Sequence, residues 1–288
     1  MKAVAVVVAY HLEPPALRPL LDSVAEAGLQ AVVVDNTPGR AVAPPGAGPE
    51  WLVLGRNSGI AHAQNVGVAR ARALGAQAVL LLDQDSRLGA DMVRRLLAGL
   101  RPGVPAIVAP VSRDARLGVE YPSFRFSALG YPRRVYAAHA AAPVPVDLVI
   151  ASGSAATMAV FDLAGGMDED FFIDYVDFEW CIRCRARGVD IHVLPGVEME
   201  HAIGAAAVQA GPLTVFVHGP ARCYYRLRNA FLLWRKPLVP RLFAFKTLAA
   251  SLMHHLLQLR AVADRRQHLA AGWAALCHGL SGVRGERP

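Results

Sequence analysis

A short apolar run that ends in two carboxylates restricts the possible folds of this chain more than any other segment. Four large apolar residues, Val79 to Leu82, lead directly into Asp83 and Asp85. Such a run is typical of a buried parallel strand. Because a buried strand cannot enclose two unpaired charges, the carboxylates must lie where the strand leaves the core. Open α/β sheets bind their ligands at that edge, so the sequence predicts a polar cleft there.

The spacing of the two carboxylates leaves two interpretations. Asp83 and Asp85 leave an extended backbone on the same side, with Gln84 facing away. Two converging carboxylates suit Mg²⁺ or Mn²⁺, which prefer oxygen ligands. A turn in which Asp side chains bond the backbone, before the next helix, explains the same residues without a metal. The motif alone does not choose between them.

Strand-like and helix-like patterns alternate through the first half of the chain, which predicts a mostly parallel, layered α/β sheet. The expected strands are 3–9, 31–34, 51–54, 79–82 and 106–111, and the expected helices are 14–28, 60–74 and 91–100. Further on, we expect an irregular segment at 112–145, strands at 146–150, 158–161 and 190–194, and a helix at 176–187.

Composition excludes several classes of protein. With 54% apolar and 18% charged residues the chain is globular. No apolar run is long enough to predict a transmembrane helix, and the N-terminal segment lacks the pattern of a signal peptide. Cys181 and Cys184 have the spacing of half a zinc or redox site, but no matching second pair follows. A reduced, cytoplasmic protein fits this cysteine usage.

A second acidic cluster lies between residues 168 and 179, where six carboxylates are mixed with aromatic residues. An apolar wall beside a carboxyl group raises its pKa toward the range that is useful for base catalysis. Glu179, Arg183 and Arg187 are spaced as an ion-paired face of a helix. His201 follows the last expected strand, where a structural histidine and a metal ligand are both reasonable.

The last third of the chain is basic. Residues 1–200 carry 18 Lys and Arg against 21 Asp and Glu, whereas residues 201–288 carry 12 against 2. Tyr224, Leu227, Phe231 and Trp234 recur at helical spacing among arginines. This segment is either a helix packed on the sheet or an interfacial helix on an anionic membrane surface. No phosphate-binding glycine loop is present, so if a diphosphate binds here, a metal held by Asp85 must supply much of the positive charge.

Together, these motifs resemble the inverting nucleotide-sugar glycosyltransferases of family 2, which have the GT-A fold, and bacterial rhamnosyltransferases in particular. The resemblance covers about residues 3–235. Its pieces are the strand ending at Tyr10, Val33–Asn36, Asn57–Ala61 with Asn65 and Gly67, Leu82–Ser86, Ser152–Ser154, Phe171–Arg183, His201 with Gly204, and Tyr224–Asn229. The segments Asp83–Ser86 and Phe172–Cys181 point to rhamnosyl transfer.

The resemblance implies a role for each matching residue. Asp177 is implied as the catalytic base, although Val176 stands where many members have Glu, which keeps Asp174 and Glu179 as rivals. Asp85 is implied as the main metal ligand, with Asp83 on metal or ribose and His201 on metal or diphosphate. The implied nucleotide site comprises Ala9, Tyr10, Asp35, Asn57, Gly59, Asn65, Asp83 and Gln84. The implied acceptor side comprises Ser152, Gly153, Asp174, Tyr175, Glu179 and Trp180.

The implied protein is a GT-A domain at 1–215, with a nucleotide half at 1–111 and an acceptor half at 112–215, followed by a helical, basic extension at 216–288. It would transfer L-rhamnose from dTDP-rhamnose, with Mg²⁺ or Mn²⁺, to a saccharide or lipid-linked acceptor in cell-envelope polysaccharide synthesis. We expect it in the cytoplasm, peripheral to the inner face of the membrane, with homo-oligomers left open. A UDP-linked donor and an inactive transferase-like scaffold are the alternatives. A nucleic-acid partner is not expected, because it explains neither acidic cluster.

Overall fold

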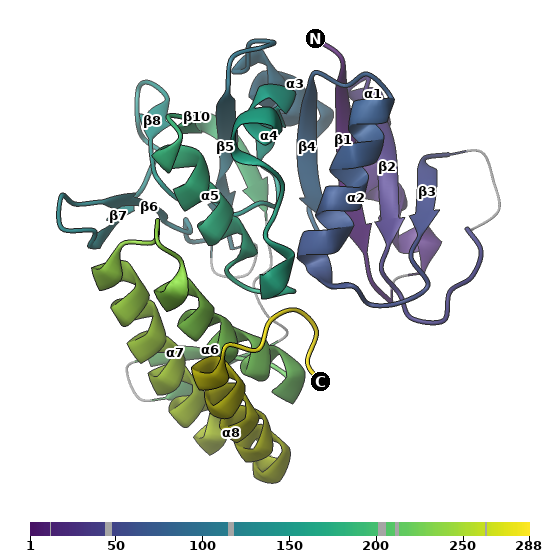
Figure 1. The fold of residues 1–288 in the computed structure, drawn as a ribbon. Coiled ribbons are helices and arrows are strands. Elements are labelled where there is room, and N and C mark those ends of the chain that lie inside the picture. Colours follow the sequence, from purple (N-terminus) through teal and green to yellow (C-terminus); the bar gives the residue numbers. More distant parts are fainter. Residues whose placement is uncertain (12, 44–47, 115–117, 201–205, 211–212, 263) are drawn as a thin grey trace.

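The computed structural model describes residues 1–11, 13–43, 48–114, 118–200, 206–210, 213–262 and 264–288. Within these residues an eight-stranded sheet forms the centre, in the order β3-β2-β1-β4-β9-β5-β10-β8 (Figure 1). Only β9 and β8 run antiparallel to their neighbours. The strands are β1 (Ala3–Ala9), β2 (Gln30–Asp35), β3 (Glu50–Val53), β4 (Ala78–Asp83), β5 (Ala106–Arg113), β8 (Val144–Pro145), β9 (Ala155–Thr157) and β10 (Asp190–Glu200). The expected mostly parallel sheet is confirmed.

Helices cover both faces of the sheet, which explains why its strands are apolar on both sides. In β1, Val4 and Val6 pack with α2 (Gly59–Ala73), α4 (Met158–Ala164) and α5 (Val176–Ala186). Ala5 and Val7 pack on the opposite face with α1 (Arg18–Glu26) and α3 (Ala90–Ala98). A short 3₁₀ helix, η1 (Pro14–Leu17), precedes α1. The sheet core is therefore built by simple alternation along β1.

Two expected strands are wrong. Residues 146–150 form no strand of the sheet, and Leu148 makes only an isolated bridge with Phe124. The segment expected as a strand at 158–161 is the first part of α4, and the strand is the preceding Ala155–Thr157. A short apolar run does not distinguish a helix from a strand. The residues expected as irregular include the hairpin β6 (Ser123–Phe126) and β7 (Pro132–Val135).

The C-terminal part forms a helical layer next to the sheet, and the carboxyl ends of β1 and β4 point toward it (Figure 1). It consists of α6 (Pro220–Arg235), α7 (Arg241–Ala261) and α8 (Arg265–Ser281), preceded by the hairpin β11 (Ala206–Ala210) and β12 (Leu213–Val217). Tyr224 and Leu227 of α6 are buried against α8, whereas Trp234 is 40% exposed. Among the helices described, none is long and apolar enough to span a bilayer.

Candidate active site

A cleft of about 760 Å³ lies at the carboxyl ends of β1 and β4, where the sheet meets α5 and α6. Carboxylates, amides and two arginines line it together with aromatic rings. The lining residues are Val8, Tyr10, Asn36, Asn57, Gly59, Ile60, Gln64, Asp83, Gln84, Asp85, Ile150, Ala151, Ser152, Phe172, Ile173, Asp174, Tyr175, Val176, Asp177, Phe178, Arg222 and Arg226. Polar groups that converge in a cleft of this size are typical of a ligand site.

Hydroxyl groups fix the end of β4, from which the first two carboxylates project. The N–H of Asp83 donates to the hydroxyls of Ser86 (3.1 Å) and Ser152 (3.3 Å), which lie 2.7 Å from each other. Gln84 does not face away as expected. Its Oε1 accepts the N–H of Tyr10 at 2.7 Å, because the strand has already turned, and this bond ties β4 to the end of β1.

Two asparagines, Asn36 after β2 and Asn57 before α2, also line the cleft. Asn57 Oδ1 accepts from Asn36 Nδ2 (3.0 Å) and from the N–H of Gly59 (3.1 Å). Asn36 Oδ1 accepts the N–H of Ser58 at 2.8 Å. Asn36 was not among the candidates, although it follows a strand-end Asp in the sequence. The pair holds the N-terminus of α2 against the end of β2.

Several implied nucleotide-site residues lie behind the cleft and not in its lining. Asp35 is 2% exposed, pairs with Arg40 at 2.8 Å and accepts the N–H of Thr37. Ala9 is buried in the core beneath it. Asn65 of α2 donates to Met167 O (2.9 Å) and to Glu169 (2.8 Å). These side chains support the walls of the cleft.

Asp177 lies at the start of α5 and lines the cleft. Its Oδ1 accepts the N–H of Phe178 at 2.9 Å. Burial raises the pKa of Asp177 to about 7, and the negative charges of Asp174 and Asp83 act in the same direction against two backbone hydrogen bonds. A carboxyl group with this pKa is suited to general-base catalysis near neutral pH.

The other acceptor-side candidates divide into two groups. Ser152, Asp174 and Tyr175 line the cleft. Glu179 is instead buried in an ion pair with Arg183 (2.7 Å), and Trp180 donates from Nε1 to Gly165 O (3.0 Å), both outside the cleft lining. Gly153 is buried behind it, where a Cβ atom would lie 2.5 Å from Met199 Sδ. His201 lies outside the described residues.

Arg222 and Arg226 of α6 complete the cleft and were missed as site residues. Arg222 pairs with Asp174 at 3.2 Å. Although burial acts against its charge, Asp174, Asp83 and Asp85 keep the pKa of Arg222 above its usual value. The two arginines are four residues apart and so share one face of the helix. That spacing was visible in the sequence, but nothing in the sequence indicated which surface the face would meet.

Asp83 and Asp85 fit a divalent cation whose remaining ligands are water and the oxygens of a phosphate group. The described residues contain no cluster of three His, Cys, Asp or Glu side chains suited to a metal. Mg²⁺ is commonly held by one or two carboxylates, with water and phosphate oxygens as the remaining ligands. Asp83 and Asp85, both in the cleft lining, are a donor set of this kind.

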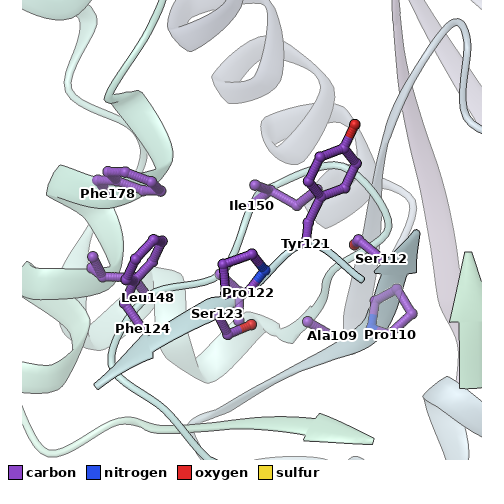
Figure 2. Close-up of a pocket in the computed structure, with 11 residues that line it drawn as sticks. Ala109, Pro110, Ser112, Tyr121, Pro122, Ser123, Phe124, Leu148, Ile150 and Phe178 are labelled. Atoms are coloured by element: carbon purple, nitrogen blue, oxygen red, sulfur yellow. The ribbon is translucent and has the colours of Figure 1, made fainter. Parts of the chain in front are cut away.

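A second, smaller cavity adjoins the cleft and shares Ile150 and Phe178 with it. Figure 2 shows these side chains together with Tyr121, Pro122 and Phe124 around it. Its volume is about 40 Å³, enough for water but not for a sugar ring. The larger cleft is therefore the candidate active site.

Comparison with known proteins identifies the family. No protein-family model matches the chain. The chain is 34% identical over 284 residues to the dTDP-rhamnosyl transferase RfbF of Shigella flexneri, covering 98% of this chain and 96% of the relative. The fold is similar to Staphylococcus aureus TarS residues 1–349 in complex with UDP-GlcNAc (TM-score 0.57, 14% identity, 98% of this chain and 82% of that one). It is also similar to GalNAc-T7 with UDP, GalNAc and Mn²⁺ (TM-score 0.55, 12% identity, 87% of this chain and 54% of that one). The expected GT-A architecture is confirmed, and this chain belongs to the same glycosyltransferase family as RfbF.

Proposed function

We propose that this glycosyltransferase moves L-rhamnose from dTDP-rhamnose to a hydroxyl group of a saccharide or lipid-linked acceptor, with inversion at the anomeric carbon. The observation that carries the proposal is the position of Asp177, a carboxylate with a pKa of about 7 in the same cleft as Asp83 and Asp85. The donor is inferred from RfbF, a dTDP-rhamnosyl transferase with 34% identity over nearly the whole chain.

In the proposed reaction, Asp177 takes the proton of the acceptor hydroxyl. The acceptor oxygen attacks the anomeric carbon while the bond from that carbon to the diphosphate breaks, and its electron pair leaves with the β-phosphate. One displacement inverts the anomer. The arginines at 222 and 226 line the cleft and are proposed to stabilise the negative charge of the departing diphosphate. A divalent cation held by Asp85 and Asp83, with His201 as a further candidate ligand, would supply additional positive charge there.

The proposed donor site lies at the ends of β1 and β4 and at the start of α2. Tyr10, Asn57, Gly59 and Gln84 line it and are proposed to contact the nucleoside. Ala9, Asp35 and Asn65 lie behind them, and we propose that they act by shaping the walls. The acceptor would enter beside Ser152 and Tyr175, which line the cleft near Asp177.

A comparison of nucleotide sugars tests the donor. With Mn²⁺ present, dTDP-rhamnose at about 100 times its Kd is expected to raise the Tm by about 5–10 °C, since a ligand that binds only the folded state stabilises it. UDP-glucose and UDP-GlcNAc at the same concentration should raise the Tm by less. A larger shift and faster transfer with a UDP-sugar would overturn the rhamnosyl assignment and favour the UDP-linked alternative. Binding without hydrolysis or transfer of any donor would favour an inactive scaffold.

We also propose that α7 and α8 bind an anionic membrane surface, where a lipid-linked acceptor would lie. Large apolar side chains are exposed along one side of each helix. They are Leu242, Phe245, Met253 and Leu256 on α7, and Leu269, Trp273 and Leu280 on α8. The segment is basic, with 12 Lys and Arg against 2 Asp and Glu in residues 201–288. Apolar and basic groups together are typical of interfacial helices.

Co-sedimentation with vesicles tests the membrane proposal. The protein should bind vesicles with about 30% anionic lipid at low salt and be released at high salt, because salt screens attraction over about 10 Å at 0.1 M. The double variant Phe245→Ser/Trp273→Ser should bind more weakly. Val42→Ser, at an apolar residue with 76% exposure far along the chain from these helices, is the matched control. Equal binding by all three proteins, or no binding at low salt, would contradict the proposal.

A further inference from the structure

The loop that carries Asp174 and leads to Asp177 has an unusual backbone. It connects η2 (Glu169–Phe171) to α5. Phe172, Asp174 and Tyr175 all have positive φ, between 63° and 64°. Side-chain-bearing residues rarely adopt this left-handed conformation. Three of them within four residues require contacts from outside the loop to hold them.

Phe172 is the tightest point of this loop. Its φ of 63° and ψ of −65° are those of a γ-turn. The turn is closed by a bond of 2.7 Å from the N–H of Ile173 to Phe171 O. On the sheet side, the N–H of Ile60 donates to Phe172 O at 2.7 Å. A Cβ atom on Gly59 would lie 2.6 Å from that same oxygen, so the loop is pressed against the start of α2.

The opposite side of the loop is held by one buried amide of α6. Asn229 is 0% exposed. Its Nδ2 lies within hydrogen-bond distance of three loop carbonyls, Phe171 O (2.7 Å), Ile173 O (2.6 Å) and Asp174 O (3.0 Å). An amide side chain has two N–H donors, so one hydrogen is shared between two carbonyls. Phe171 O also accepts the N–H of Ile173, but loss of the amide would take this donor from Ile173 O and Asp174 O, and an unsatisfied buried carbonyl is costly.

The neighbouring Arg228, also 0% exposed, joins the loop to the C-terminal tail. Its guanidinium donates to Val283 O (2.9 Å) and Gly285 O (2.8 Å) and approaches Phe171 O (3.5 Å). The tail is anchored in turn by the N–H of Gly285, which donates to Asp170 O at 2.8 Å. The ring of Tyr225 stacks on Phe172 with centroids 4.6 Å apart. The tail therefore closes over the segment just before the γ-turn.

From these contacts we infer that Asn229 is a positioning residue for the transfer reaction, assisted by Arg228 and the tail at 283–288. Its amide holds the loop in which Phe172, Asp174 and Tyr175 have a positive φ, and that backbone fixes the start of α5, where Asp177 lies. The C-terminal helices are thus part of the catalytic architecture and not only an appendage for an acceptor or a membrane. The inference rests on the proposed role of Asp177.

Substitution of Asn229 by leucine tests the inference. Leucine has a similar volume but no donor, so it should release the three carbonyls and let Asp177 shift and meet water. We expect kcat to fall by about 10–100-fold, because small displacements of a catalytic group are costly. The KM for dTDP-rhamnose should change less than about 3-fold. The midpoint of the pH–rate profile should move to lower pH, since water entering beside Asp177 reduces the effect of burial.

Two further variants separate positioning from general destabilisation. Cys223→Ala removes another buried α6 side chain, which contacts His218 O and Gln258 and not the loop. It should lower the Tm but leave kcat and the pH midpoint unchanged. Deletion of residues 283–288 removes the carbonyl partners of Arg228 and should lower kcat in the same direction as Asn229→Leu. An unchanged kcat and pH midpoint in folded Asn229→Leu, or an equal loss in Cys223→Ala, would overturn the inference.

Amide hydrogen exchange distinguishes this inference from the proposed function. In Asn229→Leu and in the tail deletion, the amides of Ile173 and its neighbours should exchange faster than in the wild-type protein, whatever the enzyme transfers. If the wild-type protein transfers no sugar but amide exchange in this loop is still faster in the two variants, the proposed function fails and the role of Asn229 in holding the loop stands. If the wild-type protein is active and exchange in the variants is unchanged, only the role of Asn229 is refuted.

Discussion

Replacement of Asp177 by asparagine is expected to lower the rate of sugar transfer by about 10²–10⁴-fold, the usual contribution of a general base. Binding of the nucleotide should persist, because the donor contacts are proposed to come from other residues of the cleft, Asn57, Gly59 and Gln84. Single-turnover transfer and thermal shift with dTDP-rhamnose measure the two quantities separately. Full activity in Asp177→Asn would exclude Asp177 as the base.

The raised pKa of Asp177 also predicts how the transfer rate changes with pH. Because burial raises the pKa of Asp177 to about 7, the carboxylate form that accepts a proton predominates only above that pH. The wild-type rate should therefore rise with pH through about 7 and then level off. The residual rate of Asp177→Asn should lack this rise. A wild-type rate that is constant from pH 5 to pH 8 would contradict a base with this pKa.

The stability of the folded protein should fall with pH over the range in which the transfer rate rises. The pKa of Asp177 is about 7 in the folded protein and about 3.9 in an unfolded chain. Between these values the folded state binds more protons, so this group lowers stability as pH rises from about 4 to 7. Asp177→Asn should have a higher Tm than the wild type at pH 8, and the difference should shrink toward pH 4.

The rival carboxylates provide the controls. Glu179→Gln alters a residue that pairs with Arg183 outside the cleft lining. This variant should therefore have a lower Tm than the wild type, with little change in the rate constant of transfer. Asp174→Asn removes a negative charge near Asp177 and should shift the midpoint of the pH–rate profile to lower pH, because Asp174 helps to raise the pKa of Asp177. A rate loss in Glu179→Gln as large as in Asp177→Asn would reopen the assignment.

Replacement of Asp85 by asparagine is expected to remove the metal dependence of donor binding. An amide is a weaker ligand than a carboxylate for Mg²⁺ or Mn²⁺, so the metal-dependent part of the affinity for dTDP should fall by about 100-fold or more. Calorimetry with dTDP, with and without Mn²⁺, measures it. Asp91→Asn is a matched control, because Asp91 follows the same strand but is an exposed residue, 76%, at the start of α3. If Asp85→Asn binds dTDP as the wild type does, with and without metal, Asp85 does not hold the metal.

Much of the fold follows from local sequence patterns. The apolar runs at 3–9, 31–34 and 79–82 predict buried strands, and the polar residues that end them predict the edge where the cleft lies. The two errors, at 146–150 and 158–161, concern short apolar runs. Such a run is too short to show whether its apolar residues recur with the period of a helix or of a strand. The strand at Ala155–Thr157 has only small side chains, and its place between β4 and β5 depends on both neighbours.

Helix geometry predicts which residues share a side of a helix, but not which surface that side will meet. Residues two apart on a helix point to nearly opposite sides, which is why Asp177 lines the cleft while Glu179 pairs with Arg183 behind it. The helical period of α5 already places Asp177 and Glu179 on different sides. Treating the acidic residues as one cluster hides this difference. Arg222 and Arg226 share a face by the same rule, yet their sequence context is equally compatible with a membrane surface.

Local patterns in the amino-acid sequence predict the parallel sheet, the two carboxylates at the end of β4 and the acidic segment that contains Asp177, because burial and periodicity are local properties of the chain. Which of those carboxylates share a cleft depends on packing between distant segments and is known from the folded structure alone. The same packing places α6 against the loop at 171–175, where it brings Arg222 and Asn229 to the loop and Arg226 to the cleft. An arginine or asparagine on a helix carries no local signal of the carbonyl or carboxylate that it will meet.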